Sequence, residues 1–142
     1  MQAIIDKQIT KQNDNALFGY QFQHDLSLST AQAQIWDKSR QIGFSFGLAI
    51  RGFGNSTRFS GFEVLYISVA QRLSIEWIDK IRTFCILEGI KPVVDNQTEL
   101  RLPNGSRFVG LPQSPATLRS YSPDEIYIDE FAHFKKDREV LT

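Results

Sequence analysis

The sequence predicts an α/β fold in which a mainly parallel sheet is flanked by helices. Residues 62–70, FEVLYISVA, are rich in β-branched and aromatic residues and carry one charge, as a strand covered on both faces does. Residues 71–89 then place apolar side chains at helical spacing and end at Gly89, a natural helix stop. The side chains expected in the core are Leu73, Ile75, Ile78, Ile81, Phe84, Cys85 and Leu87. Strands and helices that alternate in this way build parallel sheets.

Two further elements are expected before this pair. Residues 30–39, TAQAQIWDKS, fit a buried strand with Ile35 and Trp36 at its centre. Residues 45–53 then fit a short helix, which the glycine-containing loop at 52–61 is expected to stop.

Two more elements are expected after the pair. Residues 98–112 alternate polar and apolar side chains around the Asn104-Gly105 pair, which predicts a β-hairpin. Residues 123–134 begin with a short apolar strand that ends at Asp129 and Glu130. Because ligands bind beyond the carboxyl ends of parallel strands, these two acids stand where a ligand is expected.

Composition and charge limit the function classes. Sixteen basic residues balance sixteen acidic ones, so no global field draws the chain to nucleic acid or an anionic membrane, although local basic faces remain possible. Cys85 is the only cysteine, which excludes an intrachain disulfide and favours a buried, inert thiol. No apolar run approaches a membrane span, and residues 1–14 are too polar for a signal peptide. We therefore expect a soluble, intracellular protein without a membrane partner.

The stretch from Lys38 to Ser45, KSRQIGFS, has the layout of a phosphate-binding loop with one part displaced. Against the pattern G-x-x-x-x-G-K-[ST], Gly43 fits the second glycine and Ser45 fits the hydroxyl residue. Lys38 falls on the first glycine, and Phe44 falls on the lysine. The alternative is an ordinary strand–turn–helix with basic residues on its surface.

A displaced lysine does not by itself abolish phosphate binding. Backbone N–H groups from Gln41 to Ser45 can cradle phosphates at the start of a helix. Either Lys38 or Arg40 is long enough to fold back over the β and γ phosphates and supply the positive charge.

The two acids after the last strand suit the same chemistry. In phosphoryl-transfer sites a strand-end aspartate such as Asp129 holds Mg²⁺, and an adjacent glutamate such as Glu130 orients the attacking water. The alternative is that both acids stabilise the start of the following helix. His24 and His133 are the only histidines, so a zinc site is not expected.

Three segments of the sequence, taken in order, resemble a known family. They are KSRQIGFSFGLAIR, VLYISVAQRLSIEWIDKI and LPNGSRFVGLPQSPATLRSYSPDEIYIDEFAHF. Together they are similar to the ATPase domain of phage terminase large subunits, the DNA-packaging motors of tailed phages. The resemblance covers residues 17–142 and leaves 1–16 as a polar N-terminal segment. It implies a P-loop NTPase fold of the ASCE/RecA-like kind, incomplete at the C-terminus, with the hairpin as an insertion.

The same family contains a variant phosphate loop that begins with lysine or arginine and lacks the later lysine, and KSRQIGFS looks like that variant. The resemblance thereby implies ATP and Mg²⁺ as cofactors and gives a role to each matching position. Adenine is expected at Gln21, whose amide offers both a donor and an acceptor, with Tyr20 beside it. The phosphate loop comprises Lys38, Ser39, Arg40, Gln41, Ile42, Gly43, Phe44 and Ser45, with Lys38 or Arg40 as the cation.

Three further roles follow from the resemblance. Ser45 and Asp129 are expected to bind Mg²⁺, and Glu130 is expected to be the catalytic carboxylate. Arg119, in ATLRSYS, matches an arginine that acts on the γ-phosphate of a neighbouring subunit.

The implied partners are double-stranded DNA, the small terminase subunit and the portal protein, in a homo-oligomeric ring at the procapsid in the host cytoplasm. The family's coupling motif and nuclease domain do not follow Glu130, so we expect a fragment or a shortened product with weak nucleotide binding and slow hydrolysis.

Two alternatives stay open: a helicase-like nucleic-acid ATPase, and a non-catalytic remnant that acts as a binding module. Arg72, Lys80 and Arg82 are either contacts to a nucleic-acid backbone or part of a solvated face.

Overall fold

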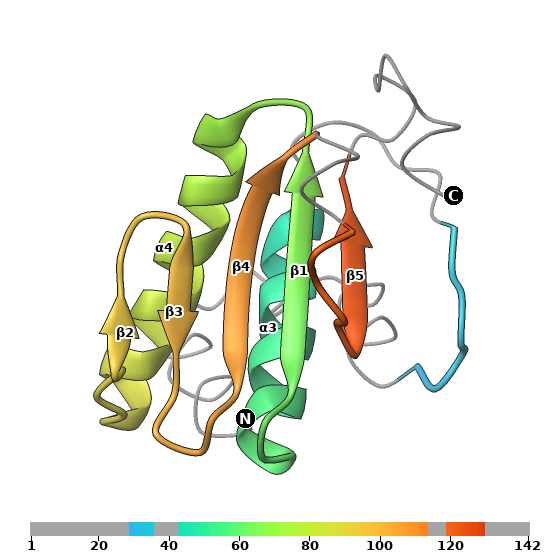
Figure 1. Ribbon diagram of the computed structural model, residues 1–142. Coiled ribbons are helices and arrows are strands. Elements are labelled where there is room, and N and C mark those ends of the chain that lie inside the picture. Colours follow the sequence, from blue (N-terminus) through green and yellow to red (C-terminus); the bar gives the residue numbers. More distant parts are fainter. Residues whose placement is uncertain (1–28, 36–42, 114–118, 130–142) are drawn as a thin grey trace, which may run out of the picture.

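The computed structural model describes residues 29–35, 43–113 and 119–129. Within them, two helices and five strands follow one another along the chain (Figure 1). Helix α3 spans Phe44–Arg58, and helix α4 spans Gln71–Glu88. The strands are β1 (Glu63–Ser68), β2 (Val94–Asp95), β3 (Glu99–Arg101), β4 (Arg107–Pro112) and β5 (Glu125–Ile128).

The strands form one mixed sheet in the order β2-β3-β4-β1-β5. Strands β4, β1 and β5 run parallel, whereas β3 pairs antiparallel with both β2 and β4. The α/β class is thus confirmed, and the described part of the sheet is mixed rather than purely parallel. The predicted hairpin is the reason, because its return strand β4 pairs with β1 along its whole length. Strand β4 is a buried inner strand, so the hairpin contributes two strands to the main sheet.

Both helices cover the same face of the sheet, and they enclose the main core there (Figure 1). Trp77 of α4 lies in this core, with its ring stacked on Tyr66 of β1 at a centroid distance of 4.8 Å. The rings of Phe108 and Tyr127 meet the indole edge-on. Leu65 points to the opposite face and joins a smaller apolar cluster. Strand β1 is therefore buried on both faces, as its composition predicts.

Several predicted elements are confirmed. Helix α4 ends at Gly89, whose φ of 69° is the left-handed conformation that stops a helix. The hairpin turn has Gly105 at φ 86°, which favours glycine for the same reason. Trp77 was missing from the predicted core although its side chain is fully buried.

The predicted end of the first helix is wrong. Helix α3 does not stop at Phe53 but continues through Gly52 and Gly54 to Arg58. Gly52 is buried, and a Cβ added there would lie 3.2 Å from the ring of Tyr127. The glycine therefore serves close packing between α3 and β5, and this packing outweighs the low helix propensity of the residue.

The predicted strand at residues 30–39 is also wrong where the structure describes it. Residues 29–35 form no strand, and the side chain of Ile35 is fully exposed. The Nη1 group of Arg51 donates to the carbonyl of Ser29 at 2.6 Å, so this segment is tied to helix α3. Trp36 and the rest of the predicted strand lie outside the described residues.

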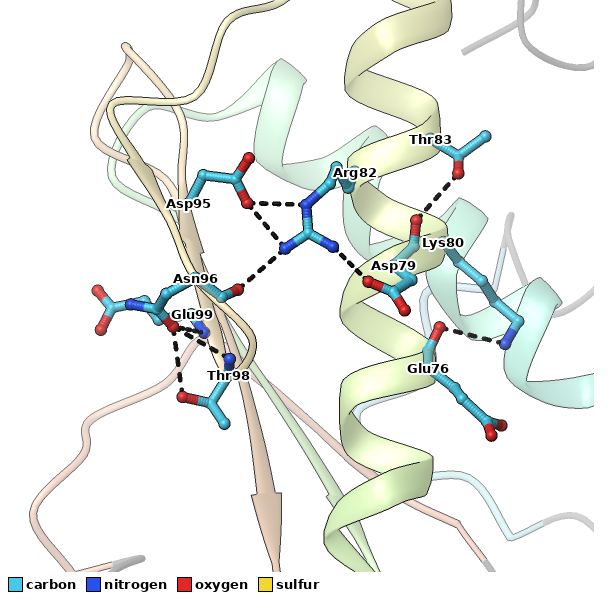
Figure 2. A network of polar contacts seen from close by, with 9 residues as sticks. All are labelled: Glu76, Asp79, Lys80, Arg82, Thr83, Asp95, Asn96, Thr98 and Glu99. Atoms are coloured by element: carbon cyan, nitrogen blue, oxygen red, sulfur yellow. Dashed lines mark hydrogen bonds and ion pairs between the residues drawn. The ribbon is translucent and has the colours of Figure 1, made fainter.

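The outer edge of the sheet is tied to helix α4 by one guanidinium group. Arg82 of α4 forms ion pairs with Asp79 and with Asp95 of β2, the latter at 2.8 Å, and donates to the carbonyl of Asn96 at 3.0 Å (Figure 2). The bonds to Asp95 raise the pKa of Arg82 above its ordinary value. The guanidinium group of Arg82 therefore stabilises the packing of β2 against α4 through charge-assisted hydrogen bonds.

The turn of the β3–β4 hairpin is anchored to the end of α3 by a buried serine. The Ser106 hydroxyl lies 2.7 Å from the carbonyl oxygen of Ser56 and 2.9 Å from that of Phe59, and it accepts from the N–H of Phe62 at 3.1 Å. Asn104 also donates to Ser56, at 2.7 Å. One fully buried side chain thus joins helix α3, strand β1 and the hairpin.

We predict that Ser106→Ala lowers the free energy of unfolding by about 1–3 kcal/mol, because it leaves buried backbone groups without a partner. Urea denaturation measures this change. Ser60→Ala, at an exposed position nearby, is the matched control and should change stability by less than about 0.5 kcal/mol. Equal effects of the two substitutions would show that the Ser106 hydroxyl is not an anchor.

Candidate functional site

Helix α3 and strand β5 place their functional ends at the same edge of the sheet. The helix runs opposite to the parallel strands, so its N-terminus lies where β4, β1 and β5 end (Figure 1). Arg51 in the middle of the helix bonds Glu125 at the start of β5, at 2.9 Å. From Arg51 the helix rises roughly 10 Å to Phe44, and from Glu125 the strand rises roughly 13 Å to Asp129. The helix start and Asp129 are therefore at about the same height.

Gly43 shapes the start of helix α3. Its φ of 78° and ψ of 24° are left-handed, a conformation that glycine adopts without the strain of a Cβ. The Gly47 N–H donates to the Gly43 carbonyl at 3.1 Å, which closes the first turn. Within α3 itself, no side chain caps this end and no acidic residue occupies the first turn. The positive end of the helix dipole thus has no carboxylate of its own helix to offset it, which favours an anion.

Phe44 directly after this glycine explains the displaced lysine of the predicted loop. Its side chain is buried and belongs to the main core together with Leu48. Burial in the core accounts for an apolar residue at this position, where the loop pattern has a lysine. Ser45, by contrast, is half-buried, so its hydroxyl is not enclosed in the core.

Asp129 is held at the carboxyl edge by the backbone and by a tyrosine. Its N–H donates to the carbonyl of Ile67 at 3.0 Å, which continues the pairing of β5 with β1. Its side chain is 9% exposed, and the Tyr66 hydroxyl donates to its Oδ2 at 2.7 Å. A carboxylate in this position is both buried from bulk water and fixed in direction.

The oxygen donors that the structure describes here fit a hard cation. The Ser45 hydroxyl and the Asp129 carboxylate are the ligand types that Mg²⁺ uses in phosphate-binding sites, where phosphate and water complete the octahedron. Among the described residues, no group of three histidine, cysteine or acidic side chains gathers as a metal site.

Arg119 is the first described residue after the gap at 114–118. Its side chain is exposed, and the segment that it begins crosses the face of the sheet away from the helices (Figure 1). Two residues further on, Tyr121 packs on that face against the cluster of Leu65, Val109 and Leu111.

The remaining predicted site residues lie outside the described residues. They are Tyr20, Gln21, Lys38, Ser39, Arg40, Gln41, Ile42 and Glu130. The same holds for the polar segment 1–16.

A polar cluster at Glu125, which the sequence did not predict, sets the position of α3 on β5. Glu125 accepts from Arg51 and Asn55 of α3, each at 2.9 Å, and from the hydroxyl of Tyr127. Burial and the neighbouring Glu125 carboxylate hold the pKa of Tyr127 well above its ordinary value. The only local signal is an acid at the start of an apolar strand, because its partners on α3 lie about seventy residues away in sequence.

The structure describes the surroundings of three further side chains, Cys85, Arg72 and Arg82. Cys85 is buried, as predicted, and burial raises the pKa of its thiol to about 11, so the nucleophilic thiolate is scarce at neutral pH. Arg72 pairs with Glu76 at 3.0 Å, and Arg82 is held in the network of Figure 2.

No protein-family model matches the chain, and no curated protein matches it. Within the described residues, neither helix has the length and apolar character that crossing a membrane requires.

Proposed function

We propose that this chain is the ATPase portion of a phage terminase large subunit, which hydrolyses ATP to drive double-stranded DNA into a procapsid. The observation that supports this most is the shared edge of the sheet, where a helix that starts at a left-handed Gly43 lies level with the buried carboxylate of Asp129. A helix start offers N–H donors to phosphates, and a strand-end aspartate offers oxygen to the metal that accompanies them.

In this proposal each residue has one task. Backbone N–H groups from Gln41 to Ser45 bind the phosphates, and Lys38 or Arg40 supplies the cation that Phe44 cannot. Ser45 and Asp129 hold Mg²⁺, which when bound neutralises charge on the phosphates.

The remaining tasks concern the base, the water and the neighbouring subunit. Gln21 and Tyr20 recognise adenine, and Glu130 orients and polarises the attacking water. Arg119, whose side chain is exposed, contacts the γ-phosphate of a neighbouring subunit. The corresponding partners are DNA, the small terminase subunit and the portal protein, in a homo-oligomeric ring in the host cytoplasm.

One observation favours a second candidate, a non-catalytic remnant. Phe44 occupies the core where the usual loop has its lysine, so the site depends wholly on a cation from earlier in the chain. A helicase-like ATPase has no observation of its own in its favour. Nucleotide binding and turnover distinguish the ATPase from the remnant.

We predict that Mg²⁺·ATP raises the melting temperature of the chain, because a ligand that binds only the native state stabilises it. Lys38→Ala should weaken this binding about tenfold or more, since a charge-assisted bond to phosphate is lost. Lys91→Ala, at an exposed position beyond the far end of α4, is the control and should leave the shift unchanged. If Arg40→Ala rather than Lys38→Ala abolishes the rise in melting temperature, Arg40 is the cation. If Mg²⁺·ATP does not raise the melting temperature of the folded wild-type chain, the proposal is contradicted.

We predict that Glu130→Ala lowers ATP turnover by about a hundredfold or more, because a positioned carboxylate no longer polarises the water. Nucleotide affinity should change little, as Glu130 acts on water and not on the phosphates. A coupled phosphate-release assay measures turnover, in a longer chain with any downstream coupling segment as well as in these 142 residues. Wild-type turnover by this variant would refute the role.

A further inference from the structure

We propose that Tyr66 is the positioning residue for the metal-binding carboxylate, and that it fixes Asp129 in the direction that a divalent cation requires. The inference rests on the proposed function, since it takes Asp129 to be a metal ligand. It adds a residue for which the sequence gave no functional signal, because Tyr66 reads only as part of an apolar strand.

The contact itself is short and enclosed. The Tyr66 hydroxyl donates to Oδ2 of Asp129 at 2.7 Å, the tyrosine is 1% exposed and the aspartate 9% exposed. The two residues come from neighbouring parallel strands, and the pairing of Ile67 with Ile128 fixes their relative height. The hydrogen bond therefore joins side chains of two paired strands, β1 and β5, which cannot shift independently.

The tyrosine ring is held from several sides. It stacks on the indole of Trp77 with an interplanar angle of 6°, and Trp77 is itself enclosed by Phe108 and Tyr127. A close-packed ring has few other positions to adopt. The hydroxyl is thus a fixed donor at the edge of the core. Trp77 influences the position of Asp129 through its stacking on the Tyr66 ring.

Packing alone does not require this hydroxyl. A phenylalanine would fill the same space among the aromatic rings, and a buried hydroxyl is unfavourable unless it is hydrogen-bonded. What the hydroxyl adds is the direction of the Asp129 carboxylate. Partners that orient a ligand in this way commonly change metal affinity by about 10–100-fold when they are removed.

The test compares three variants of the whole chain. Tyr66→Phe removes the hydroxyl but keeps the ring, and Asp129→Asn removes the proposed ligand. Tyr127→Phe is the matched control, because it also removes a buried hydroxyl, which bonds Glu125 and not Asp129. Mn²⁺ affinity at a fixed ATP concentration is measured by electron paramagnetic resonance, and the melting temperature without metal or nucleotide is recorded for each variant.

We expect Tyr66→Phe to weaken Mn²⁺ binding by about tenfold or more, Asp129→Asn to weaken it at least as much, and Tyr127→Phe to leave it unchanged. If Asp129→Asn weakens binding and Tyr66→Phe does not, Tyr66 is not a positioning residue, while the proposed function stands. If neither changes Mn²⁺ binding, Asp129 is no metal ligand and both proposals fail. If Tyr66→Phe and Tyr127→Phe weaken Mn²⁺ binding equally and lower the metal-free melting temperature equally, the effect is general loss of stability and the positioning role is refuted.

Discussion

Helix α3 is seated on strand β5 by a polar contact and a close approach, and the rest of the candidate site depends on that seating. Arg51 and Glu125 form an ion pair with side chains only 13% and 17% exposed, and Gly52 lets the helix approach the ring of Tyr127. Removing one partner of a largely buried pair costs about 3 kcal/mol. Such a contact fixes how far the helix reaches along the strand. It thereby sets the start of α3 level with Asp129 and joins two segments that are distant in sequence.

Different kinds of contact lie at different levels along the strands. Near Glu125 and Ser106, where β5, β1 and β4 begin, polar groups join the elements to one another. The middle is an aromatic core around Trp77. At the carboxyl edge lie a helix start shaped by Gly43 and the largely buried carboxylate of Asp129, which Tyr66 holds. The polar groups that join the elements thus lie at the end opposite to the candidate site, which is at the carboxyl ends of the strands, where ligands of α/β sheets bind.

Sequence patterns predicted the elements whose signal is local. The apolar run of β1, the periodicity of α4 and the Asn104-Gly105 turn each specify their structure within a few residues, and all three are confirmed. Gly52 misled the prediction, because its role is packing against a strand more than seventy residues later. Tyr66 could not have been found from sequence either, since only the strand pairing brings it to Asp129. For Phe44, the sequence showed that the residue departs from the loop pattern. It did not show the cause, which is that the side chain is buried in the core.

The central claim is that the carboxyl edge of the sheet binds phosphate and metal. Paramagnetic broadening of backbone amide signals by Mn²⁺·ATP tests this claim most directly. The account predicts that the amide signals of Gly43, Ser45 and Asp129 broaden first. The signals of Gly61 and Gly105, in loops at the opposite end of β1 and β4, should persist at the same concentration. Mg²⁺·ATP in place of Mn²⁺·ATP should shift the first set without broadening it. Broadening that begins at Gly61 and Gly105, or that spares Gly43 and Asp129, would contradict the account.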